Sequence, residues 1–569
     1  METESNEKSI CSSYSLGCYQ HPSKITDISM PNDTYSINTE YSDIEIHHEI
    51  HYKDENEASL FCQIGDFANM VKAFIGTNYM ALPFAFAKSG LVAGILGLTL
   101  IAFLTNHCSQ VLINCKTKYI ESIICHEEKK VHELKETDRK ILKSELEKNI
   151  TYSDLGRLII GPWAAHLIRI SIIISQYLTV VGYFIFIIHS ISNLLPNYFP
   201  NDKNNTTITF GITLSTIYTS QNSMHLNNFI DWPSHLKYAI VVMIPLPFFY
   251  FCGFFRTVRK LSIISCFATI FLLFGIVAVL RYLYKDYSVT KDFNYFEFNT
   301  LPIFFGQLTS SFEGIGCILP IHASMNNNRK SFSWLLSLAI FFVYCILLLF
   351  GVSGYLRYGT TVDQIIIDSV EMGNVSIYIV IITLMISVIL TYPLQVFPCI
   401  EMIEIYIFTW LSGVCDDMSL LCYKSNKTIQ VPDYNHINNA PPDEYTNLIR
   451  DFRKAENTIE PTKILKTLGI INRTVQIPFY KRMILQIVII TSTAVVSIFI
   501  VNYFAYLGAL TGALGASVLS FIIPCLIELS LRFNDINCCI VLKNVTIIIF
   551  SIVESLIILV IFAEMSYSV

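Results

Sequence analysis

The sequence predicts an all-α polytopic membrane protein with eleven transmembrane helices. Two observations predict this class. Hydrophobic residues make up 53% of the 569 residues and charged residues only 15%, whereas soluble domains carry about 25% charged residues. Apolar runs of about 20 residues recur along the chain, and this length crosses a hydrocarbon core of ~30 Å. The composition argues against a disordered chain and a basic nucleic-acid binder, so we expect a lipid bilayer and no nucleic acid as partner.

The expected spans are the apolar runs that polar segments separate. Each run is near the length that a transmembrane helix needs. The eighth run is long, and we expect it to continue beyond the membrane as a cytoplasmic helix. The runs lie at 67–88, 91–115, 164–195, 236–254, 262–284, 301–322, 333–356, 374–407, 482–504, 508–531 and 540–562.

The polar segments define the domain organisation. Residues 1–62 are rich in Ser, Asn, Asp and Glu and contain no apolar run, which predicts a disordered cytoplasmic tail rather than a signal peptide. The remaining chain is expected to comprise helices 1–8 at 63–407, with a cytoplasmic loop at 116–163 and an extracytoplasmic loop at 197–235, a cytoplasmic loop at 408–481, and helices 9–11 at 482–569.

Lys and Arg are distributed unequally between the two sets of loops. The loop between the second and third spans holds ten basic residues, whereas the loops 197–235, 285–300, 357–373 and 505–507 together hold four. Cytoplasmic loops carry the excess of basic residues. The amino terminus is therefore expected in the cytoplasm and the carboxyl terminus, after an odd number of spans, on the extracytoplasmic side.

Glycosylation sequons agree with this orientation. Asn204 and Asn205 begin overlapping sequons within one expected outside loop, and Asn374 begins another at the edge of a second such loop. Sequons also occur on the expected cytoplasmic side, so each one alone is weak evidence. The pattern is typical of a glycoprotein.

The sixteen cysteines lie in apolar helices or expected cytoplasmic segments, where thiols stay reduced. No Cys/His set has zinc spacing. The sequence also contains no phosphate-binding glycine loop and no Ser/His/Asp arrangement. We therefore expect no metal, no cofactor and no enzymatic activity.

Two of the spans are interrupted by polar residues at mid-depth. The first contains Gly76, Thr77 and Asn78, and the sixth contains a polar stretch that ends in Glu313 and Gly314. Such breaks are avoided in lipid unless the freed backbone groups face a cavity. The first and sixth spans occupy corresponding places in two five-helix halves, a pattern that points to a transporter's central site. A packing kink is the alternative for either break taken alone.

Broken helices at mid-membrane suit a zwitterionic ligand. Half-helix amino termini offer N–H groups to a carboxylate, and carboxyl termini offer carbonyl groups to an ammonium. The backbone of an amino acid carries both charges. Glu313 is an ionisable group at this depth, which is costly unless it is paired, hydrated or protonated. It is a candidate partner for the substrate ammonium or a proton carrier, with a structural hydrogen bond as the alternative.

The tenth span carries Gly508, Gly512 and Gly515. Small residues at this spacing allow close approach of helix backbones. We expect them to serve helix packing rather than substrate binding.

Two motifs resemble the proton-coupled amino acid transporter family, within the amino acid/auxin permease group of the APC superfamily. They are Val71-Lys72-x-x-Ile75-Gly76-Thr77 followed by Leu82-Pro83, and Phe312-Glu313-Gly314-Ile315-Gly316 followed by Leu319-Pro320. The resemblance implies a LeuT-type 5+5 inverted repeat plus one extra helix, with helices 1 and 6 broken. It also implies uptake or lysosomal export of small neutral amino acids, often driven by a proton gradient, so we expect symport with a proton rather than with sodium. The residues that would contact the substrate are Gly76, Thr77, Asn78, Phe312, Glu313 and Gly314.

The sequence departs from the family pattern in places. Asn69 aligns with the family's first-helix histidine, and an amide cannot titrate. Asn78 replaces a smaller residue, and the outside loops lack the cysteines of the family's disulfide. His322 stands where the family tends to carry Glu, so the proton-coupling candidates are Glu313 and His322; a histidine at the cytoplasmic interface is the alternative for the latter.

The function predicted from these features is secondary active transport of small neutral amino acids by alternating access. The membrane is expected to be the plasma membrane or the lysosomal membrane. The alternative is an amino acid-sensing transceptor with little net flux, which the long polar segments 1–66 and 412–480 suggest.

Overall fold

The computed structural model describes residues 60–130, 136–195, 233–253, 258–285, 289–312, 314–325, 331–370, 375–411, 464–465, 468, 479–532 and 537–567. Within these ranges all regular elements are helices. Most of the expected tail and of the loops 197–235 and 408–481, and also Glu313, lie outside the described residues. The domain boundaries expected from the sequence therefore remain predictions.

The helices follow one another in this order: α1 (Leu60–Phe74), η1 (Thr77–Ala81), α2 (Leu82–Ser89), α3 (Leu91–Lys130), α4 (Glu136–Asn149), α5 (Tyr152–Ile159), α6 (Pro162–Leu194), α9 (Ser234–Met243), α10 (Leu246–Gly253), α11 (Val258–Tyr284), α12 (Leu301–Ser311), α13 (Ile315–Ser324), α14 (Phe332–Tyr358), η3 (Gly359–Thr361), η4 (Ile366–Ser369), α15 (Val375–Leu411), α18 (Phe479–Phe499), η6 (Val501–Tyr503), α19 (Phe504–Thr511), η7 (Gly512–Ala516), η8 (Val518–Ile522), α20 (Ile523–Leu531) and α21 (Cys538–Tyr567).

Eight helices in the described part of the chain are long and apolar enough to cross a membrane. A ninth span is reached if α9 and α10, which are bent by 42° at a short break, count as one. These helices confirm a polytopic α-helical membrane protein. The two interrupted pairs, α1–α2 and α12–α13, are each divided into pieces too short to qualify. The count of eleven depends on them and on the bent pair, so it remains a prediction.

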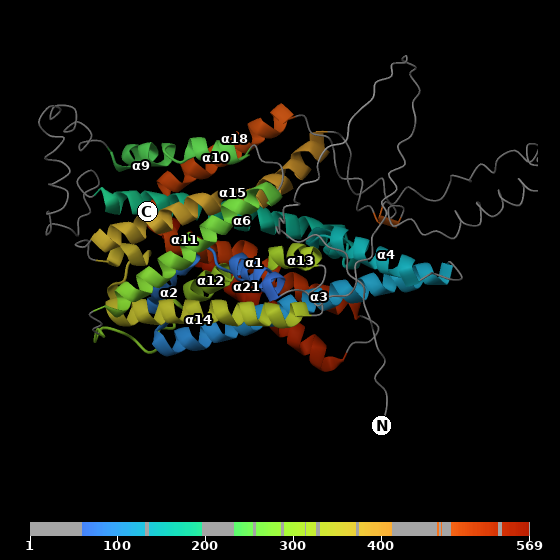
Figure 1. The fold of residues 1–569 in the computed structure, drawn as a ribbon. Helices are drawn as coiled ribbons and strands as arrows, with labels where there is room; N and C mark the ends of the chain where they lie inside the picture. The colour runs from blue at the N-terminus through green and yellow to red at the C-terminus, as the bar shows by residue number, and fades with distance from the viewer. Residues whose placement is uncertain are drawn as a thin grey trace, which may run out of the picture.

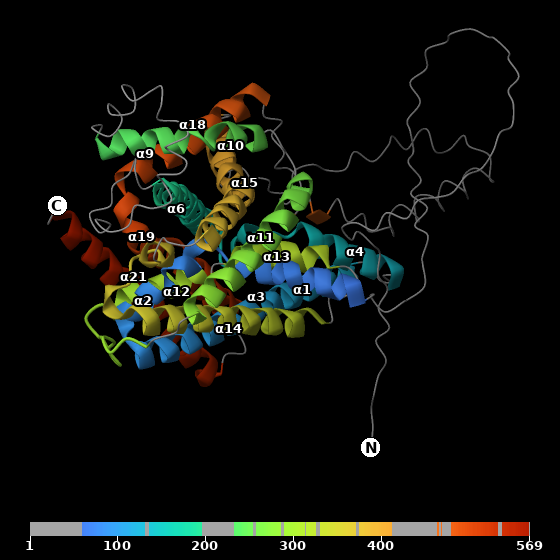
Figure 2. The ribbon, with the colours of Figure 1, turned by 60° about the vertical axis from the view of Figure 1, so that its left-hand side comes forward.

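The helices form a bundle with two opposite edges (Figures 1 and 2). In both views α9, α10 and α18 lie along one edge, while α14 and the first part of α3 lie along the other. Between them α6 packs against α15, which in turn packs against α11. The 37 residues of α15 form one continuous helix of about 55 Å. This exceeds the bilayer core, as its sequence predicted.

The first interrupted pair breaks at Ile75 and Gly76, between the end of α1 and the 3₁₀ turn η1. Gly76 is extended, with φ −92° and ψ −169°. The helix resumes at α2, where Pro83 occupies the first turn. The fixed φ of proline suits this position at the start of a helix.

The second interrupted pair breaks between Ser311 and Ile315, with Gly314 preceding α13. Pro320 lies inside α13 and has no N–H to donate to the carbonyl four residues earlier. Both breaks therefore lie where polar and Gly-containing stretches interrupt the apolar runs.

The expected packing role of the tenth-span glycines is confirmed. A Cβ at Gly512 would overlap the carbonyl oxygen of Gly306 in α12, and a Cβ at Gly515 would lie 2.5 Å from Ser175 Cβ in α6. The backbone of η7 thus contacts α12 directly. Because α12 ends at the second break, this contact fixes the position of the helix that leads into it.

Candidate functional site

The two helix breaks lie against each other. The Asn78 side-chain amide donates to Ser310 Oγ, and Gln307 Nε2 donates to the Asn78 carbonyl oxygen at 2.9 Å. On the other side, a Cβ at Gly314 would lie 2.8 Å from the Ala73 carbonyl oxygen at the end of α1. Residues more than 200 positions apart in the sequence are therefore in direct contact at the two interruptions.

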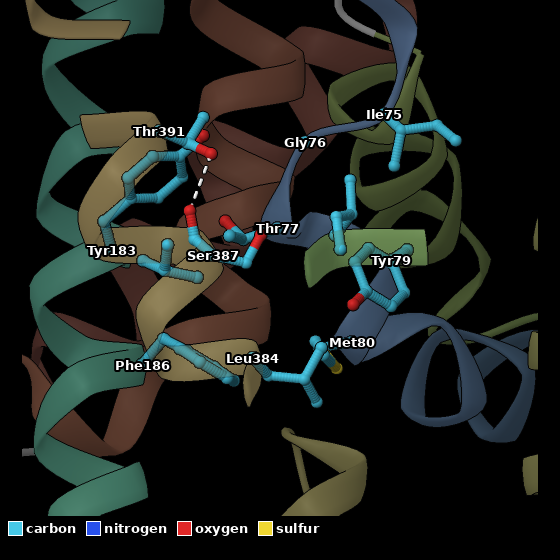
Figure 3. A pocket seen from close by; sticks show the side chains of 12 residues that line it. Ile75, Gly76, Thr77, Tyr79, Met80, Tyr183, Phe186, Leu384, Ser387 and Thr391 are labelled. Atoms are coloured by element: carbon cyan, nitrogen blue, oxygen red, sulfur yellow. Dashed lines mark hydrogen bonds between the residues drawn. The ribbon is translucent and has the colours of Figure 1, made fainter. Parts of the chain in front are cut away.

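A pocket lies beside the first break (Figure 3). Its cavity volume is about 20 Å³, so the pocket is narrow in this conformation. The break supplies one wall, α6 supplies a second and α15 a third. The lining residues are Ile75, Gly76, Thr77, Tyr79, Met80, Tyr183, Phe186, Leu272, Leu384, Ser387, Val388 and Thr391.

The polar groups of the pocket differ in whether the protein itself uses them. Thr391 Oγ1 donates to the Ser387 carbonyl at 2.8 Å, and Ser387 Oγ donates to the Ala268 carbonyl at 2.9 Å. In contrast, the buried hydroxyls of Thr77 and Tyr79 have no hydrogen-bond partner among the described residues. A buried hydroxyl without a partner is costly. Thr77 therefore offers the pocket a free hydrogen-bonding group.

No charged side chain is among the lining residues. Charges on a ligand would be met by the backbone where α1 ends, because the carbonyls of a last helical turn lack helical donors and carry partial negative charge. Apolar side chains from α6 and α15, such as Phe186 and Leu384, form the rest of the wall. This chemistry suits a molecule with a compact charged head and an uncharged remainder.

The structure brings some of the sequence-predicted site residues to the pocket and places others beside it. Gly76 and Thr77 line it. Asn78 is buried next to them, but its amide is directed at α12. Phe312 is buried, with 1% of its surface exposed, and is not among the lining residues.

The remaining predicted residues lie further along the second interrupted pair. Gly314 packs against the end of α1, and Glu313 lies outside the described residues. His322 is buried in α13, where its ring stands edge-on to Phe332 at 4.8 Å. Substrate contact and proton coupling by these residues remain predictions.

Sequence reasoning missed the lining residues from uninterrupted helices, among them Tyr183 and Phe186. An intact apolar helix gives no local sign of which face meets a pocket. One usable signal existed in the eighth span: Ser387 and Thr391 are four residues apart, so both hydroxyls lie on the same helix face. Ser387 is buried and Thr391 is half-buried, and hydroxyls on one face of an apolar helix mark that face as one that meets protein rather than lipid.

Together, the apolar helices and the pocket at the first break define an integral membrane protein with a narrow cavity between its helices. The chain belongs to the family described as transmembrane amino acid transporter protein, whose model matches residues 65–130 and 131–563. This confirms the family resemblance that the motifs in the two broken spans indicated.

The chain is similar to several proteins that are named as amino acid transporters. It is 25% identical over 345 residues to vacuolar amino acid transporter 4 of Saccharomyces cerevisiae, covering 59% of the chain and 40% of that protein. It is 27% identical over 348 residues to amino acid transporter AVT3C of Arabidopsis thaliana, covering 61% of the chain and 70% of that protein. It is 25% identical over 345 residues to the proton-coupled amino acid transporter-like protein pathetic of Drosophila melanogaster, covering 59% of the chain and 62% of that protein. The match thus spans less than half of the yeast relative.

Proposed function

We propose that this protein is a secondary active transporter that moves small neutral amino acids by alternating access, with a proton rather than sodium as the coupling ion. One observation carries the proposal: the two interrupted helices meet next to a pocket that contains the free hydroxyl of Thr77. In transporters, paired interrupted helices supply the backbone groups that bind substrate and ion at mid-membrane.

The proposed architecture is a LeuT-type 5+5 inverted repeat with one extra helix. In this scheme α1–α2 and α12–α13 are the first and sixth spans, and α21 is the eleventh. The first and sixth spans then run in opposite directions, as an inverted repeat requires. The carboxyl end of α1 would accept the substrate ammonium, and the amino end of α13 would face the carboxylate.

The preference for neutral side chains is proposed from the pocket walls. A charged amino acid side chain would require a counter-charge, because an unpaired charge away from water is costly. Tyr183, Phe186 and Leu384 instead offer aromatic and aliphatic surface. A small uncharged side chain fits this surface without leaving a charge unpaired.

Uptake into proteoliposomes tests the proposal. Purified protein is reconstituted, and accumulation of each radiolabelled amino acid is measured with and without an inward proton gradient, and with sodium in place of the gradient. We expect accumulation of small neutral amino acids that the proton gradient stimulates. Absence of uptake and exchange for all twenty amino acids would contradict transport, and binding without flux would favour the sensing transceptor.

A further inference from the structure

A buried carboxylate on the last helix has no role in the pocket. Glu554 lies on α21, near the middle of the candidate span Cys538–Glu564, and only 5% of its surface is exposed. An ionisable side chain at mid-membrane is costly, so such residues usually serve a function. Its contacts on α12 suggest what that function is.

The hydrogen bonds around Glu554 involve one hydroxyl that faces two acceptors. Thr309 Oγ1 lies 3.0 Å from the Phe305 carbonyl oxygen and 3.3 Å from Glu554 Oε1. The other carboxylate oxygen, Oε2, has no partner among the described residues. Because Thr309 has one hydroxyl proton, it cannot donate fully to both oxygens. Two full hydrogen bonds form when Glu554 carries a proton and donates it to Thr309, whereas an ionised Glu554 leaves the single Thr309 proton shared between two acceptors.

No cation compensates Glu554 from the elements that pack against α21. The helix α12 and the π-helical turns η7 and η8 contain no Asp, Glu, Lys, Arg or His. On α19 the titratable group is Tyr506, whose ring packs against Phe562.

The charged group on α20 is Glu528, which is held by Lys543 at 2.9 Å and by Arg532 at 3.5 Å; α20 also carries the thiol of Cys525. The charged groups on α21 lie towards the helix ends. Lys543 is eleven residues from Glu554 on α21, roughly 16 Å along the helix. Glu564, ten residues away in the other direction, is similarly distant.

We propose that Glu554 is the proton-binding site of the transport cycle, and that its protonation holds α12 in the position described here. This inference rests on the proposed transport function. A proton from the aqueous phase adds to the carboxylate, and the resulting O–H donates to Thr309, which keeps its own bond to Phe305. When the proton leaves to water on the other side, the carboxylate competes with Phe305 for the Thr309 proton.

The contacts of α12 carry this change to the pocket. Ser310, which follows Thr309, binds the side chain of Asn78, and Gln307, two residues before Thr309, binds its carbonyl. Asn78 follows Thr77, whose hydroxyl lines the pocket. A displacement of α12 caused by the loss of the proton therefore acts on the first break through a contiguous set of hydrogen bonds.

The test uses E554Q in proteoliposomes with two readouts: amino acid exchange without any gradient, and accumulation driven by a proton gradient. Glutamine has the same shape and can donate to Thr309, but it cannot release a proton. We expect exchange within about twofold of wild type and at least a tenfold loss of gradient-driven accumulation. The matched control is E564Q, the same substitution at an exposed position of the same helix, which should retain both activities.

The inference would be overturned if a proton gradient stimulated accumulation by E554Q as strongly as accumulation by the wild type. It would also be overturned if the wild-type protein exchanged amino acids but a proton gradient did not stimulate its accumulation of them. Absence of both activities in the wild type would instead contradict transport itself. If E554Q does not fold, infrared titration of the wild type decides the question. A buried carboxylic acid band that changes with pH should be present, and T309V, which removes the hydroxyl partner, should shift its midpoint. An unshifted midpoint or an absent band would overturn the inference.

Discussion

At the scale of single residues, Thr77 combines burial in the pocket with an unused hydroxyl. Thr391 lines the same pocket, but its hydroxyl already donates to its own helix. The two threonines therefore differ in what they can give a ligand, although their side chains are identical. The local backbone causes this difference: Thr77 follows an extended glycine, whereas Thr391 lies within α15, where an earlier carbonyl accepts its proton.

We expect Thr77→Val to raise the KM for the transported amino acid about tenfold. A hydrogen bond to a charged group is worth about 1.5–3 kcal/mol, and 1.4 kcal/mol corresponds to a factor of ten. Uptake kinetics in proteoliposomes measure the effect. Thr391→Val is the matched control and should change the KM less than twofold. Equal effects of the two substitutions would show that the free hydroxyl of Thr77 does not bind the substrate.

The candidate site was partly predictable from the sequence at this scale. The motif around Gly76 and Thr77 identified two lining residues, because a polar interruption in an apolar span has a local signature. It did not show that the Asn78 amide is directed at α12, since the direction of a side chain depends on the partner that the fold supplies. Tyr183 and Phe186 had no local signature at all.

At the scale of elements, the contact between η7 and α12 depends on the absence of a side chain. We expect Gly512→Ala to destabilise the protein by about 1–3 kcal/mol, the usual range for overpacking. Its methyl group would overlap the Gly306 carbonyl oxygen, so the two backbones must separate. Thermal unfolding in detergent measures the loss. Gly65→Ala in α1 is the control, because nothing lies within 4 Å of its added Cβ; a similar destabilisation there would refute the packing argument.

The turn η4 is attached to the bundle by hydrogen bonds on two sides. Asp368 accepts from Asn193 Nδ2 at 2.6 Å and lies 2.7 Å from His189 Nδ1, both on α6. Gln364, just before η4, donates to the Asn502 carbonyl at 2.6 Å and accepts from the Ala505 N–H at 3.0 Å. Since η4 also contacts η1, these bonds hold it next to the first break.

We expect Asp368→Ala to speed hydrogen–deuterium exchange in the segment 362–370, because both bonds to α6 are lost. Mass spectrometry of the detergent-solubilised protein measures the exchange. The matched control is Asp292→Ala, which removes an exposed carboxylate that accepts from Thr360 at 2.5 Å, just before this segment. Exchange at 362–370 should remain at the wild-type rate in the control. Unchanged exchange in Asp368→Ala would mean that Asp368 does not hold η4.

The sequence predicted the type of the long helices, because an apolar run of 20 residues in a membrane has few alternatives to a helix. The expected end of the second span at 115 is wrong, since α3 continues to Lys130 through polar residues beyond the apolar run. The sequence also located both interruptions, because a polar stretch inside an apolar run is a local feature. It did not predict the bend between α9 and α10 or the π-helical turns of the tenth span, which the stretch around Gly512 forms where it packs against α12. Such details depend on neighbours that are distant in the sequence.

At the scale of the whole molecule, the position of the carboxyl terminus depends on whether α9 and α10 form one complete span. Together they contain 18 helical residues and two connecting residues, and about 20 residues reach across a ~30 Å core. With this pair and the two interrupted pairs counted as spans, the number is eleven, and the termini lie on opposite sides. If the bent pair enters and leaves on the same side, the number is ten and the termini share a side.

We expect opposite sides, with the amino terminus in the cytoplasm, because the basic residues of 116–163 require that side for the segment between the second and third spans. Epitope tags at the two termini, probed in sealed vesicles with a membrane-impermeant protease, measure this. One tag should be cleaved and the other protected, and both should be cleaved after detergent is added. Cleavage or protection of both tags in sealed vesicles would contradict eleven spans. The bent pair lies before α12 in the chain. If it is the missing span, α1 and α13 run in the same direction, and the inverted-repeat proposal loses the antiparallel relation on which it depends.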